Sequence, residues 1–477
     1  MKSTLTFASM LLPIVLCRSI LLVGSTTTLL ADGTISVDCS SNQGAFPYYN
    51  HYVSTIRSAT GSTDDQLMKN VGVHLERTFY DMGIVCTSEG TYEWHALATG
   101  AEGPADTKYW GSDNLLDNII AQGAQPWIDL VGIPSWLRDG TTGLPTNWTK
   151  YETMIRDILR HLKSRYPQMV YVGLLNEWSN YDGCIHHSLS SYETLYQHTA
   201  NALAAVNATL SGVPLLKIGG PNESNDEYTL NLFLSWCHDN SIPIGFVSYH
   251  LYRDNISDIT STVNTVQRYM KNYGYGNLPQ LIGECGLHNS ASTTYTASDL
   301  AKQAAFEAAS WRAYMDTGLG EQVKPMIFAE NGYDGLHNLS VLVPDEADRK
   351  EGQVFPRYNG YKMMSMMRSH RISSTSNNNG IYSIASSDST GVAVLFINYS
   401  SSAQNAYINV NNLPSAFHSE NIHYDRYLVD GTHSNYAYSQ SNQGLQKVED
   451  SSLSSGSSKS LTINMAAYAT SLIVLTP

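Results

Sequence analysis

Two glutamates stand where buried strands are predicted to end, and their chemistry is the first clue to what this 477-residue chain can do. Glu177 follows Asn176 after one apolar run, and Glu284 ends another, Gln280–Glu284. Two facing carboxyl groups can cleave a glycosidic bond, because one protonates the leaving oxygen while the other attacks the anomeric carbon or activates water. A single glutamate at a strand end is a weak signal, since many cap helices or pair with arginine. The pair together predicts glycosidic chemistry.

Alternating apolar runs and amphipathic stretches predict how the two glutamates are positioned. Apolar strands separated by helices indicate a parallel sheet covered on both faces, and eight such units in about 320 residues fit an α/β fold of the (β/α)₈ barrel type. The C-terminal strand ends, where both glutamates lie, surround the reaction site of such a barrel. The predicted strands are Tyr52–Ile56, Val73–Phe79, Gln125–Val131, Tyr171–Asn176, Leu215–Ile218, Gly245–His250, Gln280–Glu284 and Lys324–Ala329. The predicted helices are Asp64–Asn70, Ser112–Ala121, Tyr151–Arg165, Ser190–Asn207, Thr229–Asn240, Ile259–Tyr273 and Ala297–Asp316.

The chain divides into four predicted regions. Residues 1–25 read as a signal peptide, and residues 51–370 as the catalytic barrel. Residues 26–50 contain one strand, Gly33–Cys39, which we expect to join the C-terminal domain. Residues 371–477 are Ser/Asn-rich and alternate apolar with polar positions, as the strands of a β-sandwich do. Strands are predicted there at Gly380–Ala385, Gly391–Asn398, Asn405–Val410, Asn421–Val429 and Ser460–Pro477, with a low-complexity loop at Ser451–Ser458.

The N-terminal segment predicts a secreted, extracellular protein. Lys2 precedes an apolar run from about Met10 to Val23, and small residues up to Ser25 provide a cleavage site. A signal anchor is the alternative, but the run falls short of the ~20 residues that span a bilayer. N-glycosylation sequons are compatible with a glycoprotein and occur at Asn147, Asn207, Asn222, Asn255, Asn338 and Asn398.

The cysteines suit an oxidising compartment. Removal of Cys17 with the signal leaves an odd number, so we expect two disulfides and one free thiol, with the pairing open. The free thiol is expected to act as a small buried apolar residue. The remaining cysteines are Cys39, Cys86, Cys184, Cys237 and Cys285.

Composition excludes several classes of function. Lysine and arginine total 28 against 42 for aspartate and glutamate, and a net charge of −14 opposes binding to nucleic acid or to an anionic membrane surface. Hydrophobic residues make up 42%, enough for a sizeable core. Nucleophile-elbow, zinc-protease and P-loop motifs are absent from the sequence. We predict a carbohydrate partner, no cofactor and no metal ion, and leave the oligomeric state open.

Motifs spread along the chain resemble those of glycoside hydrolase family 39, a retaining (β/α)₈ group that includes β-xylosidases and α-L-iduronidase. The similarity covers nearly all of the mature chain in order. The motifs that carry it are Arg77…Asp81-Met82, Pro134 with Trp148, Met154–Tyr166, Gly219-Gly220-Pro221, Phe246–Tyr252 and Pro356-Arg357-Tyr358.

The resemblance implies roles for residues at the strand ends. Glu177 would be the acid/base and Glu284 the nucleophile, with Asn176 bonded to the sugar 2-hydroxyl and with His250 and Tyr252 beside the nucleophile. The acid needs a raised pKa at Glu177, whereas the nucleophile must stay ionised. A retaining mechanism requires carboxyl groups about 5 Å apart.

Other residues are candidates for substrate contact. Arg77 is expected to be buried against the carboxylates, because an unpaired buried arginine is costly. Trp178 and Trp136 are candidate sugar platforms, and core packing is the alternative for each. Glu330, after the eighth strand, would contact substrate or cap a loop.

The sequence also departs from the family pattern. Arg77 is followed by Thr78-Phe79-Tyr80 where β-xylosidases of this group usually read Phe-His-Gly, and Gly283 replaces a usual threonine. The sugar specificity of the family therefore cannot be assigned to this chain. We expect a secreted retaining glycosidase, β-xylosidase-like or arabinosidase-like. The alternatives are a galactosidase, glucuronidase or endo-glycanase of the same clan, and a carbohydrate-binding barrel without turnover.

Overall fold

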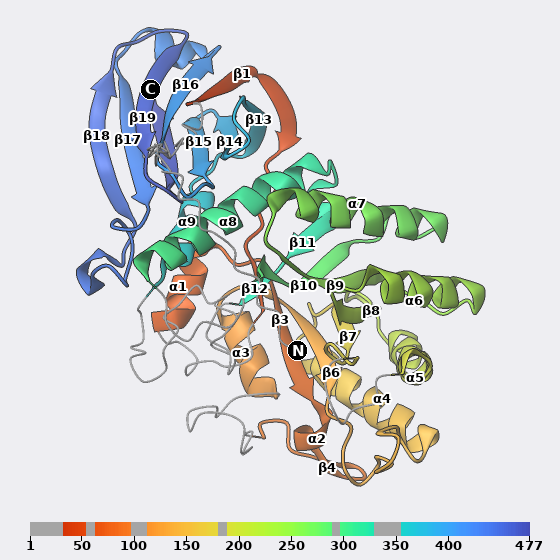
Figure 1. Ribbon diagram of the computed structural model, residues 1–477. Coiled ribbons are helices and arrows are strands. Elements are labelled where there is room, and N and C mark those ends of the chain that lie inside the picture. Colours follow the sequence, from red (N-terminus) through yellow and green to blue (C-terminus); the bar gives the residue numbers. More distant parts are fainter. Residues whose placement is uncertain (1–31, 54–62, 97–111, 180–187, 289–295, 329–353) are drawn as a thin grey trace, which may run out of the picture. The chain divides into compact units, whose positions relative to one another are not determined.

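The computed structural model describes residues 32–53, 63–96, 112–179, 188–288, 296–328 and 354–477. They form a parallel sheet surrounded by helices and a second, antiparallel-rich sheet near the C-terminus (Figure 1). The signal-peptide region and Glu330 lie outside the described residues, so those predictions stay as predictions.

The parallel sheet closes into a barrel, which confirms the predicted fold class. Its strand order is β11-β10-β9-β8-β7-β6-β3-β2-β12, with β12 paired in parallel to β2. The short strands β11 and β12 flank Met326 and together act as the eighth strand. Met326 bonds to β10 through Ile282 (2.9 Å) and Cys285 (2.8 Å), so the ring is continuous. The strands are β2 (His51–Val53), β3 (Leu75–Asp81), β6 (Gln125–Val131), β7 (Tyr171–Leu174), β8 (Lys217–Ser224), β9 (Phe246–Arg253), β10 (Gln280–Leu287), β11 (Val323–Pro325) and β12 (Ile327–Phe328).

Amphipathic helices cover the outside of this barrel. In α4 (Trp148–Arg165), Asn147 caps the first turn by accepting from Lys150 N (3.0 Å). The buried apolar side chains of α4 recur every three or four residues, so one stripe faces the strands. The other helices are α1 (Thr63–Val71), α2 (Met82–Val85), α3 (Asp113–Ala121), α5 (Leu189–Asn207), α6 (Glu227–Asp239), α7 (Ile256–Asn272), α8 (Ala297–Asp316) and α9 (Pro356–Met364), with a hairpin of β4 (Cys86–Ser88) and β5 (Thr91–Tyr92) after α2.

The second sheet is one hydrogen-bonded array of nine strands in the order β18-β17-β20-β15-β14-β13-β1-β16-β19. Residues from strands across this order, including Ile35, Val394 and Ile473, share one apolar cluster, so the array folds over its own core. The N-terminal strand β1 is inserted between β13 and β16. The strands are β1 (Gly33–Ala45), β13 (His370–Ser376), β14 (Ile381–Asp388), β15 (Gly391–Asn398), β16 (Gln404–Asn411), β17 (Ile422–Val429), β18 (Gln446–Leu453), β19 (Lys459–Met465) and β20 (Thr470–Thr476).

The cysteines correct one expectation. Cys39, Cys86, Cys237 and Cys285 are all free. Cys184 lies outside the described residues, and two disulfides would have to join at least two of the other four. The prediction of two disulfides is therefore wrong. Burial raises the pKa of Cys39 to about 12 and that of Cys86 to about 11, as in inert structural thiols.

Across the part of the chain that the structure describes, no helix has the length and apolar character needed to cross a membrane.

Candidate active site

The two glutamates meet at the C-terminal ends of the barrel strands. Glu177 follows β7, and Glu284 lies on β10. A carboxylate oxygen of Glu177, a ring nitrogen of His250 and a carboxylate oxygen of Glu284 all lie within 4.8 Å of one another. This separation matches the roughly 5 Å that a retaining pair of carboxyl groups needs and is shorter than an inverting pair requires.

Arg77 on β3 is the buried cation that holds the site together. Its side chain is fully buried, and its Nε donates to Asp129 Oδ2 (2.6 Å) on β6. Its Nη1 donates to Glu284 Oε1 (2.9 Å) and to Gly283 O (3.2 Å), and its Nη2 donates to Asn176 Oδ1 (2.5 Å). One guanidinium therefore connects strands β3, β6 and β10 and the segment that follows β7. A buried charge is tolerated only with this degree of pairing.

Two glycines make room for this network. A side chain at Gly283 would place its Cβ 3.1 Å from the Trp127 ring and 3.2 Å from Arg77 Nε. At Gly173 on β7, a Cβ would overlap the Asp129 carboxylate at 1.8 Å. The departure from the family's threonine at position 283 thus has a local reason, since the guanidinium occupies the space beside it.

Glu284 is held by a cation and a hydroxyl. Its Oε1 accepts from Arg77, and its Oε2 accepts from the Tyr252 hydroxyl (2.8 Å) on β9. The residue is only 7% exposed. Both donors fix the orientation of the carboxyl group, as a nucleophile requires.

The environment of Glu177 differs from that of Glu284, and it corrects the expectation about the pKa of Glu177. His250 Nδ1 lies 2.6 Å from Glu177 Oε1, with the ring buried on β9. Burial raises the pKa of Glu177, but hydrogen bonds from His250 and Ser224 and the charges of His250 and Arg77 outweigh it, so that the pKa falls to about 2. The expectation that this site raises the pKa of Glu177 is wrong for the site without substrate, because the histidine stabilises the charged form.

The backbone around Glu177 departs from regular strand geometry. Leu175, Glu177 and Asn222 have positive φ values of 55°, 41° and 59°. Non-glycine residues in this region carry strain and cluster at functional sites. The Glu177 N–H donates to Asn222 O (3.0 Å), and Asn222 Nδ2 donates to Leu175 O (3.0 Å), so the strained segment is held from β8.

Trp178 does not reach the site. It is 2% exposed, stacks on Tyr192 at 5.0 Å and 15°, and donates from Nε1 to Pro221 O (3.2 Å). The prediction that it binds substrate is corrected to core packing. The irregular turn at Glu177 sends the next side chain inward.

The remaining sequence candidates have distinct positions. Asn176 is oriented by Arg77 and half-buried beside Glu177. Trp136, in the loop after β6, is half-buried and donates to Cys86 O (3.0 Å), which leaves it a candidate platform at this end of the barrel. The structure thus brings together Glu177, Glu284, Asn176, Arg77, His250 and Tyr252.

Two acidic residues complete the site, and the sequence did not predict their roles. Asp129 neutralises Arg77, and the only signal was a charge inside the apolar run Trp127–Val131. Glu223, which is 1% exposed, accepts from the Ser179 N–H (3.1 Å) and hydroxyl (2.5 Å). Burial raises the pKa of Glu223. It supports the loop after Glu177 from β8.

The donor set of Glu177, His250 and Glu284 has the spacing of a metal site. However, the Arg77 guanidinium lies 2.9 Å from Glu284, and its charge would repel a cation bound to the same carboxylate. The arrangement fits charge pairing with Arg77 better than metal coordination.

The barrel, its accessory sheet and the carboxylate pair resemble those of the glycoside hydrolases built on a (β/α)₈ fold. Residues 107–292, which include both glutamates, match the family model described as "Glycosyl hydrolases family 39". The resemblance stated above is thereby confirmed.

Individual proteins are also similar to this chain. A β-xylosidase of Caldicellulosiruptor saccharolyticus is 25% identical over 174 residues, 34% of each chain, so the chain spans about a third of that relative's length. The solved structure of a glucosidase from Croceicoccus marinus has a TM-score of 0.71 and 15% identity, covering 94% of this chain and 99% of that one. A monomeric β-xylosidase from Caulobacter crescentus has a TM-score of 0.70 and 17% identity, covering 93% and 99%. These structural likenesses establish the fold.

Proposed function

We propose that the protein is a secreted retaining glycosidase that acts on oligosaccharides or polysaccharides by double displacement. The observation that carries the proposal is the approach of the Glu177 and Glu284 carboxylates to within 4.8 Å at the strand ends. This spacing leaves no room for the water that an inverting enzyme places between its carboxyl groups. Secretion rests on residues 1–25 of the sequence alone.

In the first step, Glu284 attacks the anomeric carbon. The carbon–oxygen bond to Glu284 forms as the bond to the leaving group breaks, and the leaving oxygen takes a proton from Glu177. Arg77 and Tyr252 hold the Glu284 carboxyl group in a fixed orientation through their hydrogen bonds. In the second step, water gives a proton to Glu177 and attacks the same carbon, which releases Glu284.

The acid and base roles of Glu177 place opposite demands on its pKa. Its side chain is 17% exposed, and a bound sugar would exclude the remaining water. Desolvation raises the pKa of a carboxyl group and favours the protonated acid of the first step. The His250 hydrogen bond favours the carboxylate that the second step needs as a base.

We propose a pentose glycone, with β-xylosidase-like or arabinosidase-like specificity. The sequence match to a β-xylosidase supports this class. The altered segment after Arg77 forms part of β3 beside the site, so the sugar pocket differs from the usual family pattern.

A panel of aryl pentosides, hexosides and uronides tests the proposal, with NMR to follow the anomeric configuration of the first-formed product. We expect pentosides to be cleaved with retention. Inversion would contradict the mechanism, and binding of sugars without hydrolysis by any panel member would favour a carbohydrate-binding barrel. Cleavage of hexosides or uronides alone, with retention, would support the mechanism and contradict the proposed pentose specificity.

A further inference from the structure

Three of the glycosylation sequons cannot carry a glycan in this fold. Asn398 is fully buried, and its Nδ2 donates to Ser402 O and Ala466 O, both at 2.8 Å. Asn222 is also fully buried behind the active site. Asn207 is half-buried, and its amide makes a two-way pair with the Leu216 backbone, with both distances 2.9 Å. A sugar on Asn398 would displace one of its two hydrogen bonds. A sugar on the fully buried Asn222, or on the half-buried Asn207 whose amide lies against the Leu216 backbone, would disrupt the packing around that side chain.

Two other sequons present exposed asparagines. Asn147 caps α4 through its Oδ1, which leaves Nδ2 pointing away from the helix backbone. Asn255 precedes α7 and makes no side-chain cap; its Nδ2 donates only across the surface, to Asp258 Oδ2 at 3.2 Å. One N–H of the amide is enough to keep that bond, so a glycan at Asn255 disturbs no buried contact.

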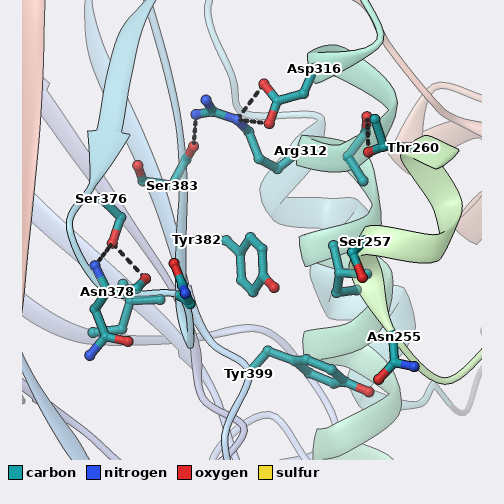
Figure 2. Close-up of a pocket in the computed structure, with 14 residues that line it drawn as sticks. Asn255, Ser257, Thr260, Arg312, Asp316, Ser376, Asn378, Tyr382, Ser383 and Tyr399 are labelled. Atoms are coloured by element: carbon teal, nitrogen blue, oxygen red, sulfur yellow. Dashed lines mark hydrogen bonds and ion pairs between the residues drawn. The ribbon is translucent and has the colours of Figure 1, made fainter. Parts of the chain in front are cut away.

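Asn255 differs from Asn147 because it lines a cavity. The cavity measures about 700 Å³ and lies between α7, α8 and strands β13 to β15, apart from the Glu177–Glu284 pair. Figure 2 shows Asn255 among the lining residues, with the Tyr382 ring between the strands and the helices and the Tyr399 ring below it. The volume lies in the range of sites that enclose a small ligand.

The lining has the chemistry of a site for a neutral sugar. Its charged side chains, Arg312 and Asp316, neutralise each other through hydrogen bonds of 2.8 and 2.9 Å. The Tyr382 ring is half-buried and lines the cavity. Tyrosine rings pack on the apolar faces of pyranoses, and the hydroxyls of Ser257 and Thr260 can bond to sugar hydroxyls.

We propose that Asn255 carries an N-linked glycan whose first N-acetylglucosamine residues lie in this cavity. The inference rests on the proposed secretion, because the donor is a lipid-pyrophosphate-linked oligosaccharide of the secretory pathway. In the transfer, Asn255 Nδ2 forms a bond to the anomeric carbon and loses one proton, while the lipid pyrophosphate leaves. The glycan then links the end of β9 and α7 to the sandwich strands, whereas a glycan on Asn147 extends into solvent.

The test uses the full chain secreted from a eukaryotic host. Peptide mass spectrometry should find glycans at Asn147 and Asn255 and none at Asn207, Asn222 or Asn398. On the native protein, an amidase that releases N-glycans should act at least tenfold more slowly at Asn255 than at Asn147, with the difference abolished after denaturation. An unmodified Asn255, a glycan at Asn398, or equal release from the two exposed sites would overturn the proposal.

A variant pair tests the cavity itself. Tyr382→Ala should make the glycan on Asn255 as accessible as that on Asn147, whereas Tyr438→Ala, at an exposed tyrosine of the same domain, should leave the difference intact. Unchanged protection in Tyr382→Ala would contradict a sugar in the cavity. Glycosidase activity is measured on the same samples, so a glycosylated but inactive protein would refute the proposed function without touching this inference.

Discussion

The mouth of the barrel and the interior of the sandwich bury opposite kinds of side chain. At the barrel mouth, Arg77 and Asp129 are fully buried beside Glu284. In the sandwich, the interior positions are apolar, as at Phe396 and Ile408. The free energy of burying a charge depends on its specific partners, whereas that of burying an apolar group depends mainly on its volume and surface area. The barrel mouth is therefore organised for chemistry, and the sandwich core for stability.

The largest expected effect is on turnover at the barrel mouth. Glu284→Ala removes the covalent route and should lower kcat by about 10⁴ or more, roughly 5 kcal/mol of transition-state stabilisation. The fold should persist, because Arg77 keeps Asp129 and Asn176 as partners. Steady-state kinetics and a thermal melt check both parts. A Glu284→Ala protein that retains a tenth of the activity would remove Glu284 from the mechanism.

The next effect is on stability. Arg77→Met leaves Asp129 and Glu284 buried without their cation, and we expect a loss of about 3–5 kcal/mol in the free energy of unfolding. Protonation of the stranded carboxyls should relieve part of this loss, so the difference from the wild type should shrink as pH falls. Denaturant titrations at several pH values measure it. A loss below about 1 kcal/mol at neutral pH would show that the network is not needed to hold these charges.

The third effect is a shift in the pH profile. His250→Phe removes the hydrogen bond that lowers the pKa of Glu177, so that pKa should rise. Because the first step needs Glu177 protonated, the alkaline limb of kcat/KM should move to higher pH, by about 1–2 units. The pH dependence with an aryl glycoside measures it, with an unmodified profile in Tyr438→Ala as control. An unchanged alkaline limb would show that His250 does not control the pKa of the acid/base Glu177.

The smallest effect lies in the sandwich. Ile408→Val deletes one buried methylene from β16 and should cost about 0.5–1.5 kcal/mol of stability. Neither kcat nor the pH profile should change, because the residue belongs to a cluster without charged members. Melting curves and kinetics below the transition test this. Altered kcat at full folding would mean that the two regions are coupled.

Strand positions were predictable where burial dictates residue type. The run Gln125–Val131 and the helix Ala297–Asp316 have the bounds that the sequence predicted, because strands covered on both faces and helices with one apolar stripe leave strong patterns. Strands β13 and β18 were missed. In β18 the side chains are largely exposed, so pairing is set by backbone hydrogen bonds that no apolar pattern reveals.

The site was predictable only in part. Glu177 and Glu284 follow from their strand ends, because the barrel brings all such ends together. The inward turn of Trp178 depends on the positive φ of Glu177, which breaks the alternation that sequence reasoning assumes. The role of Asp129 and the lowered pKa of Glu177 depend on contacts between strands far apart in sequence, such as Arg77 with Asp129 and His250 with Glu177.

The assignment of the two glutamates is tested most directly by azide rescue with NMR of the products. In Glu177→Ala, Glu284 still forms the glycosyl-enzyme, so added azide should restore activity on activated substrates and give a glycosyl azide of retained configuration. In Glu284→Ala, azide should attack the substrate directly and give the inverted product. The opposite pairing of configuration and variant, or no rescue in either, would contradict the account.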